Sequence, residues 1–222
     1  MHSMTRIMIV GATGLVGSEL LALALAHPAV SHVVAPVRRT LPAHARLLAP
    51  VVDFEHLPGQ ADWWAVDVLL CALGTTRRDA GSAEAFIRID HDYPMAVARL
   101  ARNHGVPNLV VVSAAGADAG SRLLYPRSKG LLEDGLREAG FDSITLLRPS
   151  LLLGRRVRVR PLEQLAMRVL PTLAPLLPAR YRPVRASAVA AAMLAAALAP
   201  QPGVRVVEAV DIGSLAVCAP VH

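Results

Sequence analysis

The chain has 222 residues, of which 54% are hydrophobic and 18% charged, a composition typical of a globular protein and not of a disordered one. The net charge of +6 suggests an anionic partner, but the basic stretch at residues 155–160 lacks interleaved aromatic side chains, so we interpret it as a solvated loop and expect no nucleic-acid partner. No apolar run reaches the ~18 residues of a membrane span, so we expect no membrane association. Cys71 and Cys218 lack metal-type spacing, so we expect no metal site. Because no secretory signal is evident either, we expect a cytoplasmic protein.

Short apolar segments alternate with helical patterns along most of the chain. In chain order we expect a strand at 7–10, a helix at 15–26, strands at 33–37, 47–52 and 66–72, a helix at 83–104, a strand at 108–113, a helix at 126–139, a strand at 143–148, a helix at 186–199 and a strand at 204–207. Tyr93-Pro94 should break the helix in which it lies, and the prolines between 154 and 185 predict loops and short helices. We therefore predict one Rossmann-type α/β domain over residues 1–222, a doubly wound parallel sheet with a small C-terminal substrate-side elaboration at about 150–200.

The run GATGLVG follows the first predicted strand and opens the first predicted helix. Gly11 permits a tight turn, Gly14 lets the backbone approach a pyrophosphate, and Gly17 lets the helix pack on the strand. The amide groups and positive dipole of the helix N-terminus favour phosphate. The spacing G-x-x-G-x-x-G is weak evidence alone, but its strand–loop–helix setting favours a dinucleotide site over a glycine-rich turn without a ligand.

Two arginines, Arg38 and Arg39, end the second predicted strand, where an acidic residue would bind the ribose 2′-hydroxyl of NAD. Guanidinium groups pair with phosphate through paired hydrogen bonds, so they favour the 2′-phosphate of NADPH, although ordinary surface arginines are the alternative. Asp53 follows the third predicted strand, where it either meets the adenine or caps a short helix at 54–57. We predict NADPH as the cofactor.

Candidate catalytic residues lie at the end of the fifth predicted strand and at the start of the helix that follows it. Tyr125 and Lys129 lie four residues apart and share a helix face, so the ammonium is expected to lower the tyrosine pKa from its reference of ~10 and to hold the nicotinamide ribose. Ser113 ends the strand at the carboxyl edge, where its hydroxyl would polarise a substrate carbonyl. The Y-x-x-x-K pattern alone is common on helix surfaces, but beside Ser113 and the phosphate loop it favours a reductase. Because Pro126 belongs in the first helical turn, we expect Tyr125 at the helix cap.

Together these elements resemble the short-chain dehydrogenase/reductase superfamily, and more closely its atypical NAD(P)H-binding branch related to the human Tat-interacting oxidoreductase. The matching segments run in family order over residues 6 to about 200 and are GATGLVG, the Arg38-Arg39 pair, CALGTTRRDAGS from Cys71, DHDYP from Asp90, VVSAAGAD from Val111, YPRSKG from Tyr125 and LLRPSLLLG from Leu146.

The resemblance implies cofactor and catalytic roles by position. The implied residues are Gly11, Thr13, Gly14, Leu15 and Val16 along the pyrophosphate, Arg38 and Arg39 at the 2′-phosphate, Ala72, Leu73 and Gly74 on the ribose side, Pro149, Ser150 and Leu151 at the nicotinamide, and Ser113, Tyr125 and Lys129 as the catalytic triad. Many relatives have two serines where this chain has Ser113-Ala114, so either Ser113 acts alone or Ser121 substitutes. The asparagine that assists proton relay in the larger superfamily has no evident counterpart.

We expect an NADPH-dependent oxidoreductase that reduces a small carbonyl-type substrate, with its oligomeric state open. A non-catalytic NADPH-sensing protein that binds a protein partner is the alternative, and the intact triad argues against it. Epimerase or dehydratase chemistry on a nucleotide sugar is a third reading, which the short substrate-side segment disfavours. Arg77, at the ligand edge, could meet an anionic substrate, while Trp63 and Trp64 are expected to pack and not to stack on a ligand.

Overall fold

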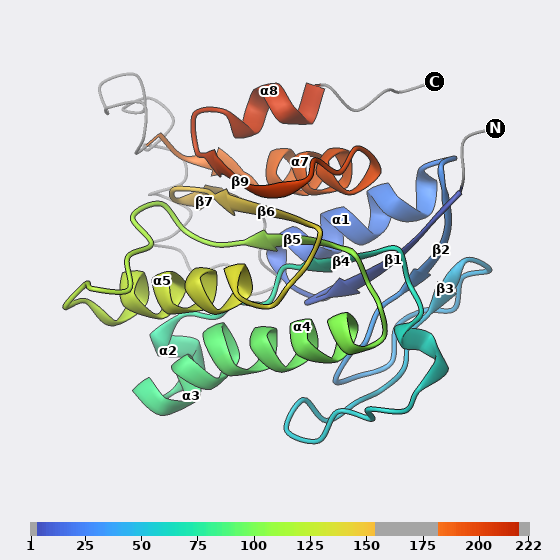
Figure 1. The fold of residues 1–222 in the computed structure, drawn as a ribbon, viewed down its shortest axis with the longest axis horizontal. Helices are drawn as coiled ribbons and strands as arrows, with labels where there is room; N and C mark the ends of the chain where they lie inside the picture. Colours follow the sequence, from blue (N-terminus) through green and yellow to red (C-terminus); the bar gives the residue numbers. More distant parts are fainter. Residues whose placement is uncertain (1–3, 154–181, 218–222) are drawn as a thin grey trace.

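The fold is a parallel sheet covered by helices on both faces, seen in a computed structural model that describes residues 4–153 and 182–217 (Figure 1). The strands are β1 (Thr5–Val10), β2 (Val30–Val34), β3 (Leu47–Leu48), β4 (Val68–Cys71), β5 (Asn108–Val112), β6 (Ser143–Arg148), β7 (Leu152–Leu153), β8 (Val184–Arg185) and β9 (Gly203–Glu208). The helices are α1 (Leu15–Ala26), α2 (Arg77–Ala80), α3 (Ala83–Ile87), α4 (Tyr93–Asn103), α5 (Leu124–Arg137), α7 (Ala186–Leu198) and α8 (Ile212–Val217), with a 3-10 turn at Asp62–Trp64 and a π-helical turn at Arg88–Asp92. The main sheet has the order β3-β2-β1-β4-β5-β6-β9, which is the Rossmann order with one further strand at its edge, so the predicted fold class is confirmed.

Alternate residues of the central strands enter two separate cores. Ile7 and Ile9 of β1 pack with residues of α1 and α7, whereas Met8 and Val10 pack with residues of α4 and α5. Figure 1 shows the same two layers, with α1, α7 and α8 on one side of the sheet and α4 and α5 on the other. Because both faces are covered at the centre of the sheet, β4 and the second half of β1 are buried and apolar at successive positions rather than alternating.

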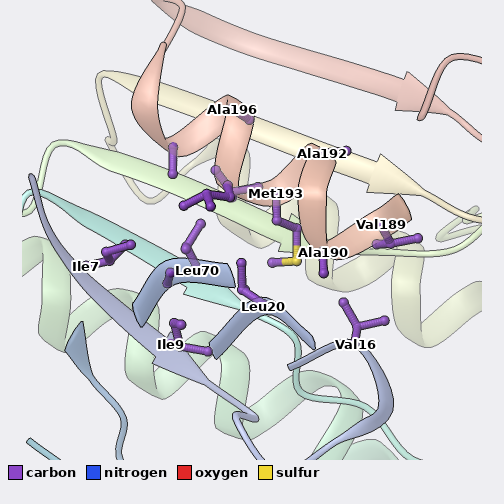
Figure 2. Close-up of a cluster of buried hydrophobic side chains, with 14 of the residues drawn as sticks. Ile7, Ile9, Val16, Leu20, Leu70, Val189, Ala190, Ala192, Met193 and Ala196 are labelled. Carbon is purple, nitrogen blue, oxygen red and sulfur yellow. The ribbon is translucent and has the colours of Figure 1, made fainter. Parts of the chain in front are cut away.

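Small side chains let α7 pack closely against α1. Ala190, Ala192 and Ala196 of α7 share one core with Leu20 of α1 and Leu70 of β4 (Figure 2). A helix that is apolar on all sides is buried in a core, as expected for this alanine-rich segment. Among the described residues, no helix has both the length and the hydropathy that a bilayer span requires.

The observed elements differ from the predicted ones mainly at their ends. β2 ends at Val34 and not at 37, since Pro36 has no N–H for a strand ladder, although Val37 still forms an isolated bridge with Val51. α5 begins at Leu124, so Tyr125 lies inside its first turn and the expected position at the cap is wrong. Pro126 fits this first turn because N–H groups there have no partner within the helix.

The predicted break at Tyr93-Pro94 is instead a continuous helix with one widened turn. The N–H of Tyr93 donates to the carbonyl of Arg88, five residues back, in the π-helical turn between α3 and α4. Pro94 has no N–H, and its ring would crowd the carbonyl four residues before it in a regular α-helix. The widened turn accommodates this proline and leaves the side chain of Asp90 buried.

Most of the predicted substrate-side elaboration lies outside the described residues. Residues 154–181, which include the basic stretch, and Cys218 are not described. On the two sides of this gap, β7 and β8 pair in parallel, with Leu152 beside Val184. The prediction of a single domain stays a prediction.

Candidate active site

A cavity of ≈ 960 Å³ lies at the carboxyl ends of β1, β4, β5 and β6, where open parallel sheets bind ligands. The predicted site residues that line it are Thr13, Gly14, Leu15, Val16, Ala72, Leu73, Gly74, Ser113, Tyr125, Lys129, Pro149, Ser150 and Leu151. Thr75, Thr76 and Arg77, which follow the fourth predicted strand at the ligand edge, line it as well. The lining residues that were not predicted are Ser18, Asp79, Phe86, Asp90, Val112, Ala114, Ala115, Leu124 and Leu152. Part of the phosphate loop and the three candidate catalytic residues therefore line the same cavity.

The glycines of the phosphate loop are required by close backbone contacts. Gly11 has a φ of 89°, and a Cβ there would lie 2.7 Å from the backbone of Ala72 in the neighbouring strand end. A Cβ on Gly17 would lie 2.0 Å from the carbonyl oxygen of Gly11. Neither glycine lines the cavity. Gly14 does line it, and as the N-cap of α1 it has no side chain that could bond to the amide groups of the first turn. Ser18, one turn further along α1, also reaches the cavity, and its i+4 spacing from Gly14 was the available signal.

The predicted 2′-phosphate and adenine residues lie away from the cavity wall. Arg38 and Arg39 are exposed just after the bridge residue Val37. Asp53 is exposed as well, and its carboxylate accepts hydrogen bonds from the Glu55 N–H at 3.0 Å and lies 3.0 Å from the His56 ring. The side chain of Asp53 thus stabilises its own turn, but residues 54–57 form a turn and not the short helix that it was expected to cap.

The candidate catalytic pair occupies one face of α5. Tyr125 is 47% exposed, and its ring lies 6.0 Å from that of Phe86, whereas Lys129 is only 3% exposed. Burial raises the pKa of the Tyr125 phenol, the Lys129 ammonium opposes this, and the Asp90 carboxylate adds to it. Lys129 thus lowers the tyrosine pKa as expected, but burial outweighs the ammonium and the net direction is upward.

An unpredicted carboxylate neutralises the candidate catalytic lysine. Asp90 is 1% exposed, and its Oδ1 lies 2.9 Å from the Lys129 Nζ as an ion pair. Its Oδ2 accepts a hydrogen bond of 2.7 Å from the N–H of Thr75, just after β4. Asp90 belongs to the DHDYP segment, but its role could not be read from spacing because it lies 39 residues before Lys129.

A second buried carboxylate binds the candidate catalytic serine. Ser113 Oγ donates to Glu133 Oε1 at 2.5 Å, and Arg148 donates to both oxygens of Glu133 at 2.9 and 2.7 Å. Arg137 adds a bond of 3.0 Å to Glu133 Oε2. Burial would raise the pKa of Glu133, but the hydrogen bonds from Arg148 and Ser113 outweigh it and hold that pKa below its usual value. Glu133 is therefore an ionised acceptor, and Ser113 directs its proton away from the cavity.

This bond bears on the expected role of the serine, which stays a prediction. A hydroxyl that donates to Glu133 presents its lone pairs, and not its proton, to another partner. The expected alternative, Ser121, is not on the cavity wall, and its Oγ accepts a hydrogen bond of 3.2 Å from the N–H of Leu123. Ser113 is thus the serine that the fold brings to Tyr125 and Lys129.

Of the remaining residues with an expected role, Arg77 lies at the cavity and Trp64 lies in the core. Arg77 lines the cavity beside Thr75 and Thr76, whereas Trp64 is fully buried and donates to the Pro58 carbonyl at 2.8 Å. Trp64 therefore packs in the core, as expected. Within residues 4–153 and 182–217, no group of three or more His, Cys, Asp and Glu side chains is arranged to hold a metal ion.

The chain belongs to the NAD dependent epimerase/dehydratase family, whose model matches residues 7–174. This membership and the Rossmann fold support an NAD(P)-dependent enzyme, which agrees with the superfamily resemblance at this coarser level.

Among its relatives, the protein fmp52, mitochondrial, of Emericella nidulans is 35% identical over 173 residues, which cover 73% of each chain. The protein FMP52, mitochondrial, of Candida albicans is 40% identical over 156 residues, which cover 67% of each chain. Neither name states a substrate.

Solved structures share the fold at low sequence identity. MoeE5 in complex with UDP-glucose and NAD superposes with a TM-score of 0.69 at 18% identity and covers 96% of this chain and 81% of its own. A putative NAD-dependent epimerase/dehydratase from Bacillus halodurans has a TM-score of 0.67 at 18% identity, with 95% and 99% covered. These matches confirm the fold and no finer property.

The names of the relatives contradict the expected cytoplasmic location. Both the Emericella nidulans and the Candida albicans proteins are mitochondrial. The expectation rested on cysteine spacing that requires no oxidising compartment and on the lack of a secretory signal, and these features do not distinguish the cytoplasm from other compartments that keep thiols reduced.

Proposed function

We propose that this protein is an NADPH-dependent oxidoreductase that reduces a small carbonyl-type substrate through Ser113, Tyr125 and Lys129. The observation that carries the proposal is their convergence on the same cavity as the phosphate loop. The loop suits a dinucleotide because the residues that begin α1, from Gly14 to Val16, line the cavity, and the first turn of α1 holds no acidic side chain to repel phosphate. The finer relation to the branch of the Tat-interacting oxidoreductase belongs to this proposal.

The cofactor, when bound, supplies the hydride that adds to the carbonyl carbon. Tyr125 then breaks its phenol O–H bond and gives the proton to the carbonyl oxygen, which becomes the hydroxyl of the product. Its exposed edge allows the tyrosinate to recover a proton from water. Ser113 already donates to Glu133, so it orients the product hydroxyl by accepting a hydrogen bond from it. Lys129 offers to the cofactor ribose the N–H donors that Asp90 leaves free.

Turnover tests the catalytic part of the proposal. NADPH oxidation is measured against a panel of aldehydes, ketones and quinones, with wild type, Tyr125→Phe and the control Tyr93→Phe. Tyr93 does not line the cavity and bonds to Glu55 at 2.6 Å, so its variant should retain activity. Loss of at least ~100-fold in kcat is expected for Tyr125→Phe alone. If NADPH binds and no panel member is reduced, the proposal of a non-catalytic NADPH-sensing protein replaces this one. Turnover of a nucleotide sugar would instead favour epimerase or dehydratase chemistry.

Cofactor preference is a separate part of the proposal. Arg38 and Arg39 are exposed and positively charged after β2, a place suited to a 2′-phosphate. Fluorescence titration should show tighter binding of NADPH than of NADH, and the Arg38→Ala/Arg39→Ala variant should remove the difference. Arg99→Ala, an exposed arginine on α4, controls for general loss of positive charge. Equal wild-type affinities for the two cofactors would refute the assignment.

A further inference from the structure

We propose that Asp90 is a positioning residue that acts through Lys129 to keep Tyr125 in the role of proton donor. The inference rests on the proposed function and extends it to a residue outside the Ser-Tyr-Lys set. Its basis is a pair of opposite charges, both almost fully buried, on the wall of the candidate active site.

The fold holds Asp90 in place from two sides. The π-helical turn at Arg88–Asp92 carries its side chain inward, and the Thr75 N–H after β4 binds its Oδ2 at 2.7 Å. The other oxygen, Oδ1, faces the Lys129 ammonium at 2.9 Å, without the direction of a regular hydrogen bond. Gly74 lies beside the pair, since a Cβ there would lie in ordinary van der Waals contact, 3.5 Å from Asp90 Oδ1 and 3.9 Å from Lys129 Nζ. The carboxylate is thus fixed beside the ammonium while the ammonium still borders the cavity.

The pair changes what Lys129 can do to Tyr125. An isolated ammonium one helical turn away would favour the phenolate, which is the form that accepts a proton. Asp90 places a negative charge beside that ammonium, so it offsets part of the effect of the ammonium on the phenol. The other titratable group packed beside the pair is the Cys71 thiol of β4, whose pKa is raised by burial and which therefore adds no charge. Arg77 and Asp79 of α2 also line the cavity and carry opposite charges. The arrangement favours a protonated Tyr125, the form that reduction consumes.

Two asparagine variants separate this role from a structural one. Asp90→Asn keeps the side-chain shape and an oxygen for the Thr75 N–H, but it removes the charge. Asp92→Asn is the matched control, since it removes the same charge two residues away, where the side chain is 56% exposed and pairs with His91. The readout is the tyrosinate absorbance during a pH titration, from which the spectrum of Tyr125→Phe is subtracted. That subtraction removes the other tyrosines, including Tyr93, whose pKa is raised to about 12 by burial and by its bond to Glu55.

The pH at the midpoint of the Tyr125 titration should fall in Asp90→Asn and stay at the wild-type value in Asp92→Asn. A folded Asp90→Asn protein with an unchanged midpoint would overturn the proposal. Where a substrate has been found, kcat for reduction should begin its decline at lower pH in Asp90→Asn, because the acid form of Tyr125 is lost earlier, while the KM for NADPH changes by less than about twofold. A purely structural Asp90 would lower stability and leave both the midpoint and the pH profile in place.

The double variant Asp90→Asn/Lys129→Met gives a second test in case Asp90→Asn does not fold, because it removes both buried charges together. If Asp90 offsets Lys129, the phenol feels little net change, so the midpoint of the Tyr125 titration stays near the wild-type value. A large rise of that midpoint in the double variant would mean that the ammonium acts without an offset, and it would overturn the proposal. Because these titrations need no substrate, they stay informative even if the protein proves to have no reductase activity.

Discussion

Removing Arg148 should expose the energetic cost of the buried carboxylate beside Ser113. Glu133 is 1% exposed and receives two hydrogen bonds from Arg148, so Arg148→Met leaves a buried charge with only Ser113 and Arg137 as partners. Breaking a buried ion pair from one side costs about 3 kcal/mol or more, and for a chain of this size that corresponds to a fall in Tm of roughly 6–12 °C. Arg137→Met is the control, because Arg137 is more exposed and makes one bond to Glu133, so we expect a loss of about 1 kcal/mol or less.

Urea denaturation of the three proteins measures this difference. The pKa of Glu133 is lowered in the folded state, so its stabilising contribution is present above the unfolded carboxyl pKa of about 4.3 and is lost as the pH falls through the lower folded value. Arg148→Met should raise the folded pKa, so the stability gap between it and wild type is expected to be full near pH 7 and to shrink in acid, once Glu133 binds a proton in the variant. Equal losses in the two arginine variants, or a gap that does not change with pH, would refute the reasoning.

Two further predictions concern packing and thiol chemistry. Gly17→Ala should abolish NADPH binding or folding, because its Cβ would lie 2.0 Å from the Gly11 carbonyl oxygen. Gly213→Ala is the control, because no atom lies within 4 Å of its Cβ. It should behave as wild type in fluorescence titration and circular dichroism. Cys71 is buried and its thiol pKa is raised by burial, so mass spectrometry should find it unmodified by iodoacetamide in the native protein and modified in urea; labelling under native conditions would mean that β4 opens.

Patterns local in the chain carried most of the correct predictions. The glycine loop, the apolar runs of β4 to β6 and the Tyr125/Lys129 spacing depend on neighbours within a few residues, and the structure places them as the periodicity implies. Element ends were less accurate where a proline acts through a missing N–H, as at Pro36 and in the widened turn before Pro94.

Long-range pairings could not be predicted from spacing. Ser113 bonds to a glutamate 20 residues further on, and the ammonium that was expected to activate Tyr125 is neutralised by a carboxylate that precedes it by 39 residues. Such contacts depend on which helix covers which strand end. The net rise of the tyrosine pKa could therefore not be predicted, since both burial and the Asp90 charge arise only from the tertiary fold.

One helix face nevertheless links all of these groups. Tyr125, Lys129 and Glu133 recur every four residues on α5, so the chain places a phenol, an ammonium and a carboxylate in a row against the sheet. The two charged members are buried, and each is balanced by a different element, Lys129 by Asp90 of the π-helical turn before α4 and Glu133 by Arg148 at the end of β6. A slide of α5 along the sheet would break both pairs together and leave two uncompensated buried charges. The same ion pairs that set the charge around Tyr125 and Ser113 therefore also fix the position of the helix that carries the tyrosine.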